Sequence, residues 1–221
     1  MPELRIAVLI SGEGRNLQSL IDACADGRIS GRIVGVLSNR AEARGLVRAQ
    51  QGGIETAVLS HREHASREAY DAALLAQLDV WRPDVVVLAG FMRILTPVFT
   101  RAYADRLLNV HPSLLPRHPG LHTHQAALDA GDTRHGATVH YVNEELDGGP
   151  AIIQGELTVL PDDTADTLAA RVMNDIELKI YPQVLAWIAC GDLRCADGVV
   201  HFRGAPLART LDLSAVEEAF R

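Results

Sequence analysis

"RIAVLISGEGRN" (residues 5–16) joins an unbroken apolar run to a loop that contains two glycines. An apolar run without polar alternation is typical of a strand that is buried on both faces, as in a parallel sheet between layers of helices. A helical pattern follows the loop at residues 16–26. The stretch therefore predicts a strand, a tight turn and a helix at the start of the chain.

The same alternation continues through the first half of the sequence. Short runs rich in Val, Ile and Leu lie at residues 32–38, 56–59, 84–90 and 106–110, and helical patterns lie at 41–52 and 66–81. In the last of these helices the apolar residues recur at spacings of four, four and three, and Ser66 can cap the first turn. We predict an α/β fold with a doubly wound, mostly parallel sheet.

The second half has a different pattern. The runs at 136–142 and 151–160 are separated by a loop too short for a helical crossover, which predicts an antiparallel pair. A long helix is expected from Thr164, with a break or kink at Pro182. The run at 193–202 predicts a small surface hairpin that turns at Asp197-Gly198, followed by a short tail. We expect one domain over residues 1–221.

Composition and charge exclude several classes of protein. The 221 residues are 48% hydrophobic and 22% charged, with a formal net charge of −7. An acidic chain is unsuited to sequence-independent binding of nucleic acid, and no apolar run reaches the roughly 18 residues of a membrane span. The three cysteines have no metal-type spacing and are expected to be reduced thiols. These features predict a cytoplasmic protein without nucleic-acid or membrane partners.

The glycine loop "SGEGRN" (11–16) is a candidate phosphate site. A tight turn before a helix directs backbone N–H groups at an anion, and Arg15 and Asn16 add a cation and an amide donor. The position three residues after Gly14 is Leu17, so the loop is not a dinucleotide fingerprint, and it lacks the Gly-Lys of a Walker A motif. The alternative is a plain turn from strand to helix.

The stretch "NVHPSLLPRHPGLHTH" (109–124) is a candidate catalytic segment. Asn109 and His111 are two residues apart at the end of an apolar strand, so their side chains point to the same side of the sheet. Ligands bind at the carboxyl ends of strands in open α/β sheets. The three prolines that follow would hold one wall of such a site in fixed, non-helical conformations.

An amide beside an imidazole suits a reaction in which a carbonyl oxygen gains negative charge, as in acyl transfer. Asp147, in the turn "LDGGP", is a candidate carboxylate to orient the imidazole and to favour its protonated form. The alternative is that both are ordinary polar residues at a strand end and in a turn. The four histidines of 109–124 form no HExxH pattern and no cysteine lies nearby, so we predict no metal.

Seven segments, taken together and in order, carry a resemblance to a known family. They are "LISGEGRNLQSLID", "VLSNRAEARGL", "SREAYD", "PDVVVLAGFMRIL", "LLNVHPSLLPRHPGLHTHQAAL", "HGATVHYVNEELDGGPAIIQ" and "IYPQV". Over roughly residues 5–190 the chain closely resembles the phosphoribosylglycinamide formyltransferases, folate-dependent enzymes of purine synthesis. The resemblance implies a Rossmann-like formyltransferase fold with a phosphate-binding half (1–105) and a catalytic and folate-binding half (106–221).

The resemblance also implies a reaction and a set of site residues. A formyl group passes from 10-formyltetrahydrofolate, as co-substrate, to the glycyl amine of glycinamide ribonucleotide through a tetrahedral intermediate, in a monomer or homodimer. Asn109 and His111 match the catalytic asparagine and histidine, and Asp147 matches the aspartate that supports the histidine. The ribonucleotide-binding positions are Gly14, Arg15, Asn16 and Glu177. The folate-binding positions are Arg67, Met92, Arg93, Ile94, Leu95, Asn143, Glu144, Glu145 and Leu146.

Two positions depart from the family pattern. Arg15 stands where a small serine is common, and the segment before "IYP" carries one residue more than the usual spacing. Glu177 matches the substrate-binding glutamate when it is counted back from Pro182, whereas the other register would select Ile176. Two further functions stay open: a sibling formyl-folate enzyme such as a hydrolase, and a non-catalytic folate- or nucleotide-binding module.

Overall fold

The computed structural model describes residues 3–221, and its centre is a seven-stranded sheet in the order β3-β2-β1-β4-β5-β6-β7. The first five strands of this order are parallel, whereas β6 runs antiparallel to both of its neighbours. The strands are β1 (Leu4–Ile10), β2 (Gly31–Ser38), β3 (Thr56–Val58), β4 (Val85–Leu88), β5 (Leu107–His111), β6 (Arg134–Tyr141) and β7 (Ala151–Thr158). The predicted mostly parallel sheet with an antiparallel pair is confirmed.

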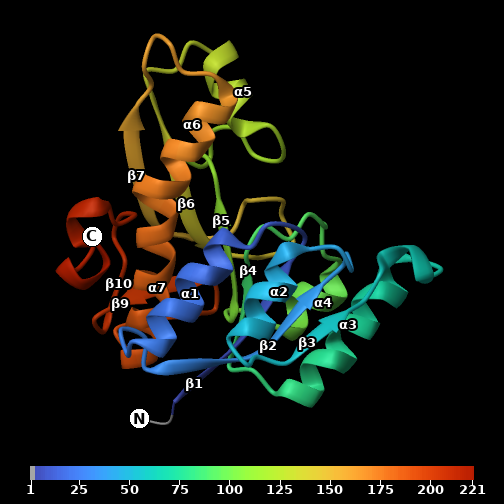
Figure 1. Cartoon of the computed structure of the whole chain (residues 1–221). Helices are drawn as coiled ribbons and strands as arrows, with labels where there is room; N and C mark the ends of the chain where they lie inside the picture. The colour runs from blue at the N-terminus through green and yellow to red at the C-terminus, as the bar shows by residue number, and fades with distance from the viewer. Residues whose placement is uncertain (1–2) are drawn as a thin grey trace.

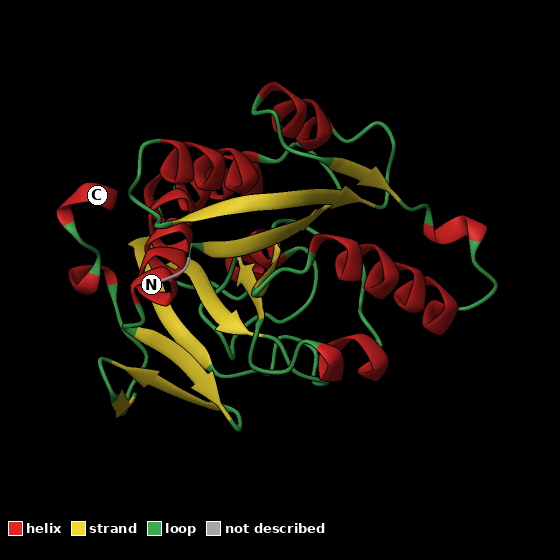
Figure 2. Cartoon of the chain, turned by 90° about the horizontal axis from the view of Figure 1, so that it is seen from below, coloured by secondary structure: helices red, strands yellow, loops and turns green. Residues whose placement is uncertain are grey.

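Helices cover both faces of this sheet (Figures 1 and 2). One core contains Ile6 and Val8 of β1 and packs under α1, α2, α6 and α7, while Ala7 and Leu9 of the same strand belong to a second core under α3 and α4. The helices are α1 (Arg15–Ala25), α2 (Arg44–Gln51), α3 (Arg67–Trp81), α4 (Pro97–Ala102), α5 (Thr123–Asp129), α6 (Ala165–Val172) and α7 (Leu178–Cys190). Burial on both faces explains why the strands read as continuous apolar runs.

A serine cap fixes the start of α3, and a glycine in β2 sets how closely the helix packs on the sheet. The Ser66 hydroxyl accepts a hydrogen bond from Ala69 N, so the predicted cap is confirmed. Trp81, at the other end of α3, packs directly on β2 at Gly35, where an added Cβ would lie 2.2 Å from the indole. Glycine inside this strand therefore allows the close approach of helix and sheet.

The long helix expected from Thr164 is interrupted, but not at the predicted place. Thr164 caps α6, and five residues of π-helix (Met173–Glu177) then lead into α7. Pro182 lies inside α7 and ends no element, so of the predicted break or kink the break is wrong, while the kink stays a prediction. The π-segment has already displaced the ordinary hydrogen-bond ladder one turn earlier, and this is the point at which the helix departs from α geometry.

The C-terminal part forms a second, three-stranded sheet and then returns to the core. β8 (Leu193–Ala196) and β9 (Val199–Phe202) pair antiparallel around Asp197-Gly198, as predicted, and β10 (Ala205–Pro206) pairs with β9. The tail is less superficial than expected, because Val216 and Phe220 are buried in the same core as α7. The Trp187 indole N–H also donates to the Glu217 carboxylate at 3.0 Å.

The strand order places a topological switch beside β1. The chain moves outward through β2 and β3 and then crosses to β4 on the other side of β1. Open α/β sheets bind ligands outside the carboxyl ends of strands at such a point. Within residues 3–221, none of the helices combines the length and the apolar composition that crossing a bilayer requires.

Candidate active site

A cavity of about 1000 Å³ opens at the carboxyl ends of β4 and β5. It is lined by fourteen of the residues that sequence analysis selected for the site: Asn16, Arg67, Met92, Arg93, Ile94, Leu95, Asn109, His111, Asn143, Glu144, Glu145, Leu146, Asp147 and Glu177. The other two, Gly14 and Arg15, do not line the cavity and precede Asn16 at the start of α1. Segments from both halves of the chain thus meet around one space.

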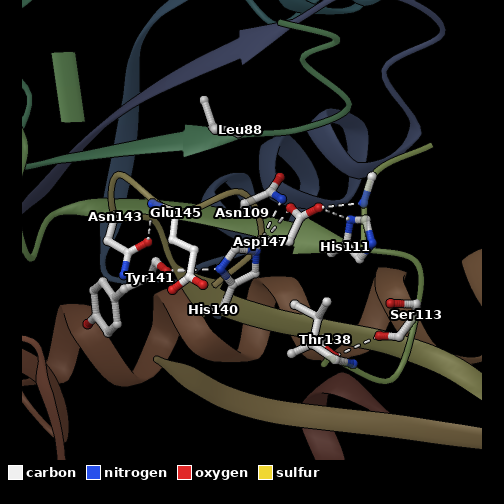
Figure 3. A network of polar contacts seen from close by, with 12 residues as sticks. Leu88, Asn109, His111, Ser113, Thr138, His140, Tyr141, Asn143, Glu145 and Asp147 are labelled. Atoms are coloured by element: carbon white, nitrogen blue, oxygen red, sulfur yellow. Dashed lines mark hydrogen bonds and ion pairs between the residues drawn. The ribbon is translucent and has the colours of Figure 1, made fainter. Parts of the chain in front are cut away.

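Asn109 and His111 project from the end of β5 into this cavity (Figure 3). The His111 Nδ1 lies 3.5 Å from the Asp147 carboxylate, and its Nε2 lies 3.0 Å from the backbone oxygen of His118. The Asp147 carboxylate also accepts a hydrogen bond from Gly120 N at 2.8 Å, which fixes its position. Both ring nitrogens of His111 therefore face oxygen acceptors, and the ring is only 5% exposed.

His140, which sequence analysis missed, orients the Asn109 amide from the neighbouring strand β6 (Figure 3). The His140 Nδ1 lies 2.9 Å from the Tyr141 backbone oxygen and donates to it, so Nε2 is free to accept from Asn109 Nδ2 at 3.2 Å. Burial lowers the pKa of His140, which disfavours the protonated form of its ring. The signal in the sequence was a single histidine inside an apolar strand, but its partner depends on strand register.

The loop after β1 has the geometry of an anion site. Gly14 adopts a left-handed conformation (φ 75°) and leads into α1, whose first turn has neither a side-chain cap nor an acidic residue. The N–H groups of that turn are therefore available to an anion. The one carboxylate in the loop, Glu13, is paired with Arg48 at 2.8 Å and with Arg44 at 3.4 Å.

Glu177 lies opposite this loop and is bonded to it. Its carboxylate accepts a hydrogen bond from Asn16 Nδ2 at 2.7 Å, and it is 5% exposed. Burial raises the pKa of Glu177, while the Asn16 hydrogen bond and the charge of Arg15 oppose the shift. Ile176 is buried in the hydrophobic core, so of the two registers left open, only Glu177 faces the cavity. The π-segment covers the stretch for which the resemblance implied an additional residue, and a wider turn of this kind can take one up.

The predicted folate segment forms an apolar wall of the cavity. Met92 and Ile94 are each 60% exposed, and Leu146 on the loop opposite is 54% exposed. Arg67 donates to the backbone oxygen of Ile94 at 2.7 Å, which joins α3 to this wall. An open slot between apolar side chains, with a few polar groups at its edge, suits a flat aromatic ligand.

Two of the other histidines of the 109–124 segment, His118 and His124, contact other side chains. His118 lies 2.8 Å from the Asp132 carboxylate, and this hydrogen bond lowers the pKa of Asp132. The His124 and His135 rings lie 3.0 Å apart at their nearest nitrogens, and burial lowers the pKa of both, to about 4 for His135. Across residues 3–221, the structure contains no group of three or more His, Cys, Asp or Glu side chains that could hold a metal ion.

Comparison with known proteins matches this architecture to one family. The formyl transferase family profile matches residues 4–185. The phosphoribosylglycinamide formyltransferase of Escherichia coli K12 is 52% identical over 204 residues, which cover 92% of this chain and 96% of that protein. The human trifunctional purine biosynthetic protein adenosine-3 is 42% identical over 193 residues, which cover 87% of this chain and 19% of that protein.

A solved structure of the phosphoribosylglycinamide formyltransferase from Coxiella burnetii superposes with a TM-score of 0.90 at 46% identity. The match covers 95% of this chain and 99% of that one. Sequence and architecture thus agree over almost the whole chain. The chain therefore belongs to the formyl transferase family and, within it, to the phosphoribosylglycinamide formyltransferases.

Proposed function

We propose that the chain transfers the formyl group of 10-formyltetrahydrofolate to the glycyl amine of glycinamide ribonucleotide, a step of purine synthesis. The observation that carries the proposal is the convergence of Asn109, His111 and Asp147 on one cavity. That cavity also reaches the apolar wall around Met92 and the buried Glu177 beside the phosphate loop. A binding module would have no need of a proton-moving histidine between two ligand sites.

In this proposal the folate occupies the apolar side of the cavity. Its flat ring system lies between the segment Met92–Leu95 and the loop Asn143–Asp147, and Arg67 and Arg93 at the rim offer cations to its carboxylates. The ribonucleotide lies on the other side, with its phosphate at the N–H groups of Gly14 to Asn16 and its ribose hydroxyls near Glu177. An acidic chain thus binds two anionic molecules through local donors.

The polar trio then supplies the chemistry. The glycyl nitrogen attacks the formyl carbon, and the formyl oxygen becomes an oxyanion that accepts hydrogen bonds from Asn109 Nδ2 and His111. One N–H of the Asn109 amide donates to His140, and this contact fixes the plane of the amide. In this proposal the second N–H of the amide then points toward the formyl oxygen. The bond between the carbon and N10 of the folate breaks, N10 gains a proton, and the amine loses one. His111 moves this proton with the support of Asp147.

The same proposal assigns the whole chain, residues 1–221, to one formyltransferase domain. The half 1–105 supplies the phosphate loop, and the half 106–221 supplies the catalytic trio. We propose small-molecule substrates only, without a metal ion.

The test is a spectroscopic formyl-transfer assay with 10-formyl-dideazafolate as the donor, run with and without glycinamide ribonucleotide. Deformylated folate that forms only when the ribonucleotide is present supports the proposal. Equal formation without it would identify a formyl-folate hydrolase, in which water takes the place of the amine. Binding of both ligands without turnover would identify a binding module.

A further inference from the structure

Two side-chain contacts join the phosphate loop to the π-segment. The Asn16 amide donates to Glu177 at 2.7 Å, and the Arg15 guanidinium donates to the Asn174 side-chain oxygen. The second contact joins the two stretches that the resemblance marked as unusual, the loop position Arg15 and the segment that contains Asn174. Arg15 and Asn174 therefore lie together on the side of the cavity proposed for the ribonucleotide.

The π-segment explains how one short stretch of helix makes both contacts. Asn174 and Glu177 both lie in this segment, and each forms a hydrogen bond with a side chain of the loop after β1. One extra residue in an α-helix would rotate all later side chains by about 100°. The wider π-turn takes up that residue. As a result Glu177 still meets Asn16, and Asn174 is placed against Arg15.

The Arg15 guanidinium keeps most of its donors for a ligand. An arginine side chain carries five N–H donors, and in the described part of the chain the Asn174 oxygen is their one hydrogen-bond acceptor. None of the ion pairs among residues 3–221 involves Arg15, and the nearby Glu13 carboxylate is already paired with Arg44 and Arg48. The Arg15 guanidinium is thus held by Asn174 without a direct ion pair in the described residues, and its charge also acts on the Glu177 carboxylate.

A second observation indicates that a ligand belongs here. Asn16 is 6% exposed and lines the cavity, yet its Oδ1 has no hydrogen-bond partner anywhere in residues 3–221. A buried polar atom without a partner is costly in the free protein. A hydroxyl of a bound sugar phosphate would satisfy this oxygen, while the uncapped first turn of α1 would satisfy the phosphate.

We propose that Asn174 holds the Arg15 guanidinium at the phosphate loop, where it pairs with the phosphate of the acceptor and makes that phosphate a requirement for tight binding. The inference rests on the proposed function for the identity of the acceptor. Arg15 is the binding residue and Asn174 is a positioning residue. The phosphate does not change during formyl transfer, so this contact stabilises the bound substrate and the transition state equally and acts on KM, not on kcat.

The experiment compares the unmodified chain with Arg15→Ala, Asn174→Asp and Arg44→Ala. KM and kcat are measured for glycinamide ribonucleotide, and calorimetry gives the Kd of ribose 5-phosphate without turnover. Hydrogen bonds to charged groups lead us to expect that Arg15→Ala raises both KM and Kd at least about tenfold, with kcat within about twofold. Arg44→Ala removes one positive charge beside the same loop and is the matched control, with an expected change below about threefold.

Asn174→Asp tests whether Asn174 holds the Arg15 guanidinium in place for the phosphate or only lies near it. The new carboxylate has nearly the shape of the amide, but it competes with phosphate for the guanidinium and repels it, so KM and Kd should rise about as much as in Arg15→Ala. A ribose 5-phosphate Kd that is unchanged in both variants overturns the inference. So does an equal loss in Arg44→Ala, or an unmodified chain that does not bind ribose 5-phosphate. If ribose 5-phosphate binds and responds to these variants as expected but no formyl group is transferred, the proposed function is contradicted, whereas the role of Arg15 and Asn174 in phosphate binding is confirmed.

Discussion

Replacing Glu177 by glutamine tests how much stability the chain loses by burying a carboxylate at the proposed ribonucleotide site. The carboxylate is 5% exposed, and burial raises its pKa. The amide of the variant keeps the shape and can still accept from Asn16, but it carries no charge to desolvate. Each unit by which the folded-state pKa exceeds the unfolded value corresponds to about 1.4 kcal/mol of lost stability at high pH. For a chain of this size, each such 1.4 kcal/mol corresponds to a melting temperature roughly 3–6 °C higher, so the variant should melt higher than the unmodified chain at high pH.

The pH dependence of this difference has a definite sign. Because the folded chain holds the Glu177 proton more tightly than the unfolded chain does, the unmodified protein loses stability as pH rises from the unfolded pKa through the raised folded pKa. Below that window the side chain is neutral in both states, so the two proteins should melt alike. Above it, Glu177→Gln should melt higher by a constant amount.

Two assays check these expectations on the same samples. Differential scanning calorimetry from pH 4 to 9 gives the melting curves on both sides of the unfolded glutamate pKa, and Asp175→Asn, an exposed carboxylate in the same π-segment, is the control with no expected gain. In turnover assays Glu177→Gln should raise KM for the ribonucleotide about fivefold for each lost hydrogen bond of about 1 kcal/mol. A variant that melts lower than the unmodified chain at pH 8, or a difference that does not vary with pH, would refute the reasoning.

Three further substitutions test the trio and the core. His111→Ala should lower kcat by about two orders of magnitude or more, since the proton-moving group is lost; unchanged kinetics in the folded variant would remove this residue from the mechanism. Asp147→Asn should lower kcat about tenfold, because the charge 3.5 Å from His111 disappears, and a wild-type pH–rate profile would show that the two are uncoupled. Gly35→Ala should destabilise the chain by about 1–3 kcal/mol in urea unfolding, since its Cβ would overlap Trp81. Gly12→Ala, whose added Cβ would have no atom within 4 Å, is the control and should unfold at the same urea concentration as the unmodified chain.

The apolar runs predicted the parallel strands because burial on both faces leaves a direct mark on composition. Ile6 and Ala7 belong to different cores, so neither position can be polar. The role of His140 left no such mark, because its contact with Asn109 depends on the register of two strands that only the folded sheet defines. The π-segment was also missed, since i, i+4 periodicity describes an unbroken α-helix and Pro182 offered a more familiar reason for a break.

The bond between Asn16 and Glu177 spans 161 positions of the chain and bears on how the protein is made. A ribosome extends the chain from its N-terminus, so the phosphate loop leaves it long before its partner exists. Until residue 177 has been added and folded, the proposed ribonucleotide site lacks one wall. A ligand of that site can therefore stabilise only a chain that already contains both residues in the folded state, and a shorter chain has its apolar cores alone.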